Sequence, residues 1–444
     1  MEEVILSTKY ALDSISIYRN LLEDEVLSKF RKLLDYISKT QVELDGAINL
    51  YNEFFFLFAK STSISLEEYI LEKIIYDDNP FSSLGTNEKA ASNDLNSLQL
   101  VSKLSSEVIK SKLIQIFSNS EYKYLIEKLP TWVSKIEVEE SLLYQDNLKR
   151  IKGIITSNIC WSESTKDLFE FHKNNGCGVF AHFKAFVWER LMGKGQLKGI
   201  DAPDPTLLSD LIGYELERST VIENTLQFLN GFSANNVLLY GDRGTGKSST
   251  VKAILNEYYS QGLRMIEIPK AYLTDFPSII RELKNRPQKF IIFIDDLVFG
   301  DEEESYTALK AILEGGLESK TSNIVIYATS NRRHLIKEYF SERKGLLSKE
   351  PNDEIRAHDS IEEKLSLSDR FGINVIFSSP DQNRYLSIVE GLAEKRNLNI
   401  NKENLYKEAL KWAIWYNGRS ARTARQFIDW LEGDLATREV TEYE

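Results

Sequence analysis

The chain has 444 residues, of which 42% are hydrophobic, and it carries a formal net charge of -12 with an isoelectric point near 5.2. A chain of this length buries a sizeable core in two or three domains, and the acidic balance excludes a surface that is basic overall. Its two cysteines follow no disulfide or metal-ligand pattern, and no apolar run approaches the roughly 20 residues of a bilayer span. We therefore expect a cytoplasmic protein without a membrane segment.

Residues 1–205 are predicted to form a mostly helical domain, because apolar residues recur every three or four positions, as in EDEVLSKFRKLLDYISKTQ. The aromatic residues Phe180, Phe183, Phe186 and Trp188 also show helical spacing, which favours packing in a helical core. No motif in this half indicates a reaction. We assign it to the recognition of an unknown protein partner.

Residues 206–380 alternate short apolar runs with helical stretches, which predicts a parallel sheet covered by helices on both faces. The five predicted strands are NVLLYG, RMIEI, KFIIFID, NIVIYAT and INVIF. Residues 381–444 show helical patterns alone and are predicted to form a small helical lid. The expected fold class is therefore α/β, a five-stranded parallel core with a C-terminal helical lid, preceded by a mostly α-helical domain.

The strongest chemical signal is GDRGTGKS, which runs from Gly241 to Ser248 between a predicted strand and a predicted helix. Glycines let such a loop turn its backbone N–H groups around phosphate oxygens at the positive end of the helix. We expect Lys247 to reach the β- and γ-phosphates and Ser248 to bind magnesium. The predicted ligands are ATP and Mg²⁺, and the predicted phosphate-loop residues are Gly241, Asp242, Arg243, Gly244, Thr245, Gly246, Lys247, Ser248 and Ser249.

Two acidic residues end the third predicted strand. Asp295 is expected to hold magnesium, directly or through water, and Asp296 to position or deprotonate the attacking water. Asp296 is one methylene shorter than the glutamate that is common at this place, which leaves slow turnover open. Asn331, at the polar end of the next strand, is expected to contact the γ-phosphate or the water. Its alternative role is to cap the following helix.

Six segments, in this order along the chain, resemble the AAA+ ATPases, a superfamily of P-loop NTPases: NNVLLYGDRGTGKSS, KFIIFIDDL, LKAILEGGLE, IVIYATSNRRHL, EKLSLSDRFG and GRSARTARQF. They resemble more closely an uncharacterised bacterial ATP-binding family that is known as a domain of unknown function. The resemblance covers roughly residues 205–432.

This resemblance implies that Asn331 is the sensor 1 residue, Arg370 the arginine finger and Arg422 the sensor 2 arginine of the lid. Because an arginine finger acts on the nucleotide of a neighbouring subunit, the resemblance also implies a homo-oligomer. Ile212, Gly213 and Tyr214 are similar to the segment on the adenine side of such sites. These roles come from the resemblance and are expectations for this chain.

We predict an ATPase that acts as an oligomeric switch or remodeller of a protein partner. The segment PKAYLTDFPSII lacks a clear substrate-gripping loop, with Tyr272 an imperfect candidate, which argues against protein threading. One alternative is a DNA-associated loader or initiator-type ATPase, supported by basic residues such as Arg332, Arg333 and Arg419 but opposed by the acidic total. The other is an ATP-binding scaffold that does not hydrolyse ATP, suggested by Asp296. GTP is disfavoured because the chain has no NKxD element.

Overall fold

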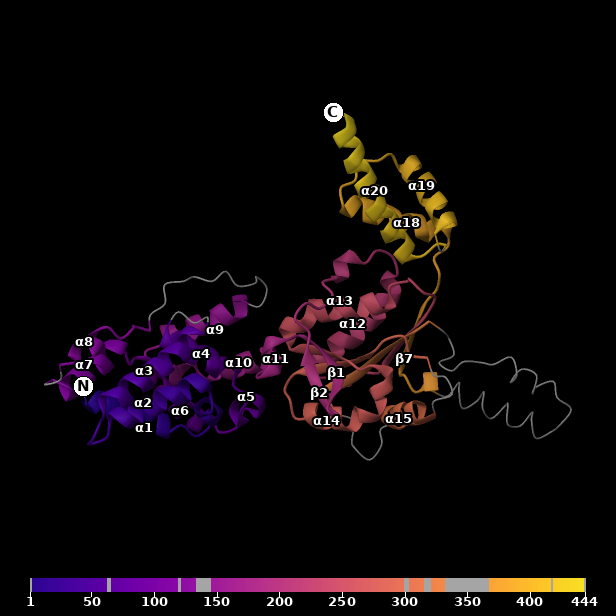
Figure 1. The fold of residues 1–444 in the computed structure, drawn as a ribbon. Coiled ribbons are helices and arrows are strands. Elements are labelled where there is room, and N and C mark those ends of the chain that lie inside the picture. The colour runs from indigo at the N-terminus through magenta and orange to yellow at the C-terminus, as the bar shows by residue number, and fades with distance from the viewer. Residues whose placement is uncertain are drawn as a thin grey trace. The chain divides into compact units, whose positions relative to one another are not determined.

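The computed structural model describes residues 2–61, 65–118, 121–132, 145–298, 303–314, 321–331, 367–416 and 418–442. The chain divides into two compact units, Met1–His182 and Phe183–Glu444 (Figure 1). The basic residues Arg332 and Arg333 and the charged stretch 341–363 lie outside the described residues. No helix within these ranges combines the length and the apolar character that a membrane crossing requires.

The N-terminal unit is helical throughout its described residues, as predicted. Two short 3-10 helices, η1 (Arg19–Leu22) and η2 (Trp161–Ser164), lie among the α-helices. The α-helices are α1 (Glu2–Asp13), α2 (Glu25–Ile37), α3 (Leu44–Ala59), α4 (Leu66–Tyr76), α5 (Pro80–Leu84), α6 (Glu88–Ser102), α7 (Ser106–Ile116), α8 (Lys123–Glu127), α9 (Gln145–Ser157), α10 (Thr165–Asn175) and α11 (Val179–His182).

Capping and apolar periodicity explain this helical unit. Asp24 starts α2 by accepting hydrogen bonds from the N–H groups of the first turn, and the buried residues of α2 then recur along one face. Phe30 of α2 packs against Phe54 of α3, with ring centroids 4.7 Å apart. The Asp94 carboxylate of α6 accepts backbone hydrogen bonds from the turn that follows α1. One apolar core therefore joins helices that are distant in the sequence.

The second unit is built on a sheet of seven strands in the order β2-β1-β4-β5-β6-β3-β7. All neighbouring pairs are parallel except β1 and β2, which form an antiparallel hairpin. The strands are β1 (Ala185–Leu191), β2 (Lys194–Gly199), β3 (Val237–Gly241), β4 (Leu263–Glu267), β5 (Lys289–Ile294), β6 (Ile324–Ser330) and β7 (Ile373–Phe377).

The prediction of a five-stranded, fully parallel sheet was therefore wrong in strand number and in the direction of one strand. The five predicted strands are present, and the two additional strands extend the sheet beyond β4. Phe186 and Trp188, which we interpreted as helical, lie on β1 and are buried with a period of two. The strand β2 was missed because its residues are mostly exposed and polar, without the apolar run of a buried strand.

Helices cover both faces of the sheet (Figure 1). One face carries α12 (Glu215–Leu229) and α13 (Lys247–Tyr258), and the other carries α14 (Phe276–Leu283) and α15 (Glu303–Glu314). Three helices follow the last strand. They are α18 (Gln382–Lys395), α19 (Lys402–Trp415) and α20 (Ala421–Glu442). Their buried residues belong to the same apolar cluster as those of β3 and β5, so the C-terminal helices are packed onto the sheet unit.

Candidate nucleotide-binding site

The loop between β3 and α13 has the conformation that its glycines allow. Gly241, Gly244 and Gly246 all have positive φ angles, which are 134°, 75° and 94°. A Cβ atom on Gly241 would lie 2.1 Å from the carbonyl oxygen of Phe377 in β7, so that position has no room for a side chain. The loop turns tightly and delivers Lys247 to the first turn of α13.

Lys247 is almost fully buried, with 6% of its surface exposed. Its Nζ atom donates to the carbonyl oxygens of Gly241 (2.9 Å) and Asp242 (2.7 Å) and to Oδ1 of Asn331 (3.1 Å). Burial lowers the pKa of Lys247, and the negative charges of nearby aspartates oppose that effect. Since all three acceptors are neutral oxygens, an anion that reaches this ammonium group gains a charge-assisted hydrogen bond.

A cluster of oxygen atoms lies at the carboxyl ends of β5 and β6. Ser248 Oγ donates to Oδ1 of Asp295 at 2.6 Å, and the Thr329 hydroxyl donates to the same oxygen. Among the described residues no group of three or more His, Cys, Asp or Glu side chains forms a metal cage. A hydroxyl and one carboxylate suit Mg²⁺, which takes its remaining ligands from water and phosphate.

Asp296 and Asn331 are joined at the same edge. Asn331 Nδ2 donates to Oδ1 of Asp296 at 2.6 Å, while the other end of this amide accepts from Lys247. Asp296 has a φ of +50°, and its backbone N–H donates to the Thr329 hydroxyl at 2.9 Å. Asn331 therefore connects the lysine of the loop with the second acid of the strand. Its alternative role as a helix cap concerns residues outside the described ranges.

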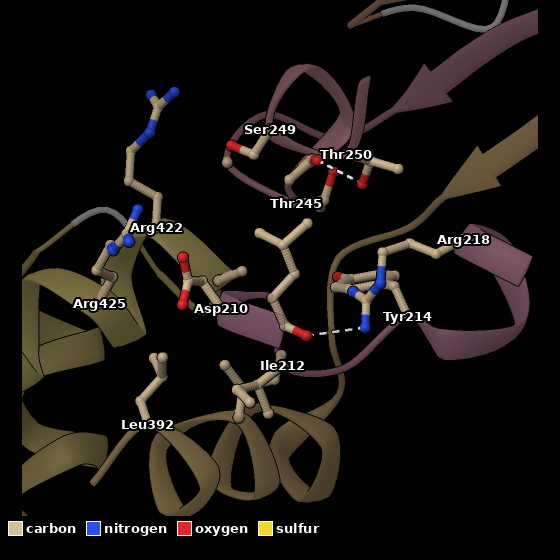
Figure 2. Close-up of a pocket in the computed structure, with 15 residues that line it drawn as sticks. Asp210, Ile212, Tyr214, Arg218, Thr245, Ser249, Thr250, Leu392, Arg422 and Arg425 are labelled. Atoms are coloured by element: carbon tan, nitrogen blue, oxygen red, sulfur yellow. Dashed lines mark hydrogen bonds between the residues drawn. The ribbon is translucent and has the colours of Figure 1, made fainter. Parts of the chain in front are cut away.

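Next to this oxygen cluster, a second pocket lies between the loop, the segment 210–214 and the C-terminal helices (Figure 2). The backbone N–H of Arg422 in α20 donates to the carbonyl oxygen of Gly244 at 2.9 Å. Arg422 lines this pocket as well as the pocket of Lys247, Asp295 and Asp296. The other lining residues include Asp210, Leu211, Ile212, Tyr214, Arg218, Ser249, Ile388, Leu392 and Arg425.

The predicted site residues are distributed unevenly around the two pockets. Most loop residues and Ile212 line one pocket or both, whereas Gly241 and Asp242 line neither and accept hydrogen bonds from Lys247 through their carbonyl oxygens. Gly213 lines neither pocket, and its carbonyl oxygen accepts a hydrogen bond from Arg218. Arg370, in the turn before β7, lines neither pocket either, and its role as an arginine finger remains a prediction.

Sequence reasoning missed several lining residues. Arg425 lies three positions after Arg422 on α20, so helical periodicity offered a signal for it. Tyr214, which the resemblance already placed in the adenine-side segment, does line the pocket, whereas no motif marked Arg218. Ile388 and Leu392 belong to the apolar stripe of α18, which by itself indicates only packing.

The segment that carries Tyr272 is held by the β1–β2 hairpin. Asp275 accepts hydrogen bonds from Nε1 of Trp188 and Nε of Arg190, both at 2.9 Å. The Arg190 guanidinium lies 5.4 Å from the centroid of the Tyr272 ring. These contacts connect the segment of Tyr272 to β1.

Residues 181–435 match the family described as "Protein of unknown function (DUF815)". Homologs of 26S proteasome regulatory subunit 4 from Dictyostelium discoideum and Schizosaccharomyces pombe are 32% identical over 111 residues and 38% identical over 66 residues. These matches cover 21% and 14% of this chain. The chain spans 25% and 15% of the length of those two relatives.

Two solved structures of mutant RuvB from Thermotoga maritima are also similar, with TM-scores of 0.36 and 0.34 and identities of 16% and 18%. The similarity covers 53% of this chain and 67% and 68% of theirs. The family match and the proteasomal relatives confirm the recognition of an AAA+ protein related to a family of unknown function. Since the family match extends over more than half of the residues of this chain, the chain belongs to the DUF815 family.

Proposed function

We propose that this chain binds ATP with magnesium and hydrolyses the bond between the β- and γ-phosphates. The observation that carries the proposal is the contact chain Lys247–Asn331–Asp296 beside the Ser248–Asp295 pair, at the carboxyl edge of the sheet. An ammonium group, a hydroxyl and two carboxylates thus surround one pocket. This set of groups suits a triphosphate and its cation.

Each residue then has a defined task. Phosphate oxygens would take over the Nζ hydrogen bonds that Lys247 now makes to backbone carbonyls. Ser248 and Asp295 would hold magnesium, which when bound neutralises the charge that develops on the phosphates. Asp296, oriented by Asn331, would align the attacking water and accept its proton as the water oxygen bonds to the γ-phosphorus. The bond from that phosphorus to the bridging oxygen breaks, and ADP leaves.

We infer that the C-terminal helices act as a lid. Arg422 contacts the loop at Gly244 and lines both pockets, so a nucleotide would lie against α20 as well as against the sheet. The side chain of Lys395 in α18 contacts Asp210 on the opposite wall. Closure of these helices would therefore depend on what occupies the pockets.

We also infer a homo-oligomer that acts as a switch or remodeller of a protein partner bound by the N-terminal helical unit. Arg370 lines neither pocket of its own chain, which supports an action on the nucleotide of a neighbouring copy. The alternative of a DNA-associated ATPase drew on two groups of basic residues, of which Arg332, Arg333 and His334 lie outside the described residues and Arg419, Arg422 and Arg425 lie within them. It is kept as one arm of the experiment.

The test is steady-state phosphate release from ATP over a series of protein concentrations, with and without DNA. Lys247→Ala is expected to abolish hydrolysis because it removes the buried ammonium group, and Arg370→Ala is expected to abolish it in trans. A mixture of these two inactive variants should regain activity, since one supplies the arginine and the other an intact loop. Wild-type protein that binds ATP without turnover at every concentration would refute hydrolysis and favour the scaffold alternative.

A further inference from the structure

Most polar side chains that line the pocket of Figure 2 are already bonded within the protein. The hydroxyl groups of Thr245, Thr250 and Tyr214 donate to the backbone carbonyl oxygens of Asp242, Gly246 and Ser378, respectively. The Asp210 carboxylate accepts from the backbone N–H of Leu207. The donors of these hydroxyl groups are therefore used within the protein, and these four side chains can offer a base only acceptor oxygens. Backbone groups are then the next candidates to read the base.

Arg218 controls those backbone groups. It is 8% exposed, its Nη2 donates to the carbonyl oxygen of Leu211 at 2.9 Å, and its Nη1 donates to that of Gly213. Burial lowers the pKa of Arg218, and the charges of Glu215 and Glu217 oppose that effect. One guanidinium group thus holds the two carbonyls that flank Ile212.

The conformation of the segment suits this arrangement. Gly213 and Tyr214 both have positive φ angles, 76° and 63°, so the chain turns sharply before α12 begins. Ile212 lines the pocket, and within the described part of the chain neither its N–H nor its C=O makes a hydrogen bond. Ile388 and Leu392 line the same pocket with apolar side chains that suit a flat base.

We propose that Arg218 is a positioning residue that makes this pocket select adenine over guanine nucleotides. It does so by holding the carbonyls of Leu211 and Gly213 and leaving the peptide groups of Ile212 to meet the base. This inference rests on the proposed nucleotide binding and deepens it, because it assigns the base selectivity to one side chain outside the phosphate loop.

The chemistry of the two bases explains the selection. Adenine presents an amino donor beside the N1 acceptor, whereas guanine presents the O6 acceptor beside an N1–H donor, in the reverse order. A free guanidinium would donate to the O6 and N7 of guanine, the commonest specific contact of an arginine with a base. Because Arg218 instead donates to the carbonyls of Leu211 and Gly213, this attraction to guanine is removed.

The positions of the other two arginines of the pocket, Arg422 and Arg425, agree with this proposal. Arg422 also lines the phosphate pocket, and in Figure 2 its side chain points away from Ile212. Arg425 lies across the pocket from Arg218, on the side of Asp210. Their positions suit the phosphates and the outer wall of the pocket.

The test compares the equilibrium affinities of ADP and GDP, measured with fluorescent analogues and by competition, so that hydrolysis plays no part. Wild-type protein is expected to prefer ADP. In Arg218→Met the ratio of the two affinities should fall by about tenfold or more, the effect of a mispaired hydrogen bond. Arg218→Lys keeps the charge without the forked donors and should be intermediate. The control, Arg384→Met, removes a cation that lies over the Tyr214 ring but contacts neither carbonyl, and should leave the ratio unchanged.

An equal loss of ADP and GDP affinity in Arg218→Met would mean a merely structural role and would overturn the inference. Should that variant fail to fold, inosine diphosphate decides with the wild-type protein alone, because it has the O6 and N1–H of guanine without the amino group. Binding of inosine diphosphate as tight as that of ADP would contradict the proposal. Wild-type protein that binds no nucleotide would instead contradict the proposed function.

Discussion

Acidification should destabilise the N-terminal unit through His172. This side chain is fully buried in α10, and its Nε2–H donates to the carbonyl oxygen of Ile75 at 3.0 Å, which fixes the neutral ring with its proton on Nε2. Burial lowers the pKa of His172 from 6.5 to about 4. Because the folded pKa lies below the unfolded one, the unfolded chain binds the proton more readily between these values.

The stabilisation that neutral His172 provides is therefore complete above pH 6.5 and is lost as the pH falls towards 4. One pKa unit corresponds to about 1.4 kcal/mol, so the shift removes about 3 kcal/mol of unfolding free energy over this interval. No discount for solvent screening applies, since the ring is buried. A loss of this size is a large share of the stability of a typical domain.

Hydrogen exchange of peptides from α4 and α10, measured in the full chain from pH 7 to 4.5, gives the local unfolding free energy after correction for intrinsic exchange. His172→Gln can still donate to Ile75 but does not titrate, so it serves as the matched control. Its unfolding free energy should fall less with acidification than that of the wild type, because most of the loss of about 3 kcal/mol should be absent in the variant. Identical pH dependence in the two proteins would refute the reasoning.

Three further predictions concern the nucleotide-binding unit. Gly241→Ala should lower the unfolding free energy more than Gly246→Ala in urea titrations, because both have positive φ but only the first would place a Cβ 2.1 Å from a carbonyl oxygen; equal losses would contradict the steric argument. Asn331→Ala should reduce the turnover number about 100-fold while ATP affinity changes little, since the orienting bond to the second acid is lost; unchanged turnover would remove Asn331 from the mechanism. Asp295→Asn should abolish the gain in ATP affinity on adding Mg²⁺ but leave the affinity in EDTA unchanged, and a retained magnesium effect in calorimetry would count against this metal site.

Local sequence carried much of the information about the edge of the sheet where the proposed nucleotide site lies. The glycines and Lys247 of the loop act through conformations and groups within eight consecutive residues, so the motif alone predicted their arrangement. Asp295 and Asn331 were predicted to lie at one edge of the sheet because polar residues that end buried parallel strands meet there. The five central strands were predictable for the same reason, since burial on both faces leaves continuous apolar runs.

Tertiary structure alone decided which distant groups meet. The sequence of β2 is too polar to predict a strand, and it becomes one because β1 pairs with it and joins the edge of β4. No sequence pattern distinguishes Arg218 from other charged residues. The turn at Gly213 and Tyr214 brings two backbone carbonyls to its guanidinium. Sequence patterns record periodicity and local conformation, whereas hydrogen bonds between separate segments depend on a chain path that only the folded core establishes.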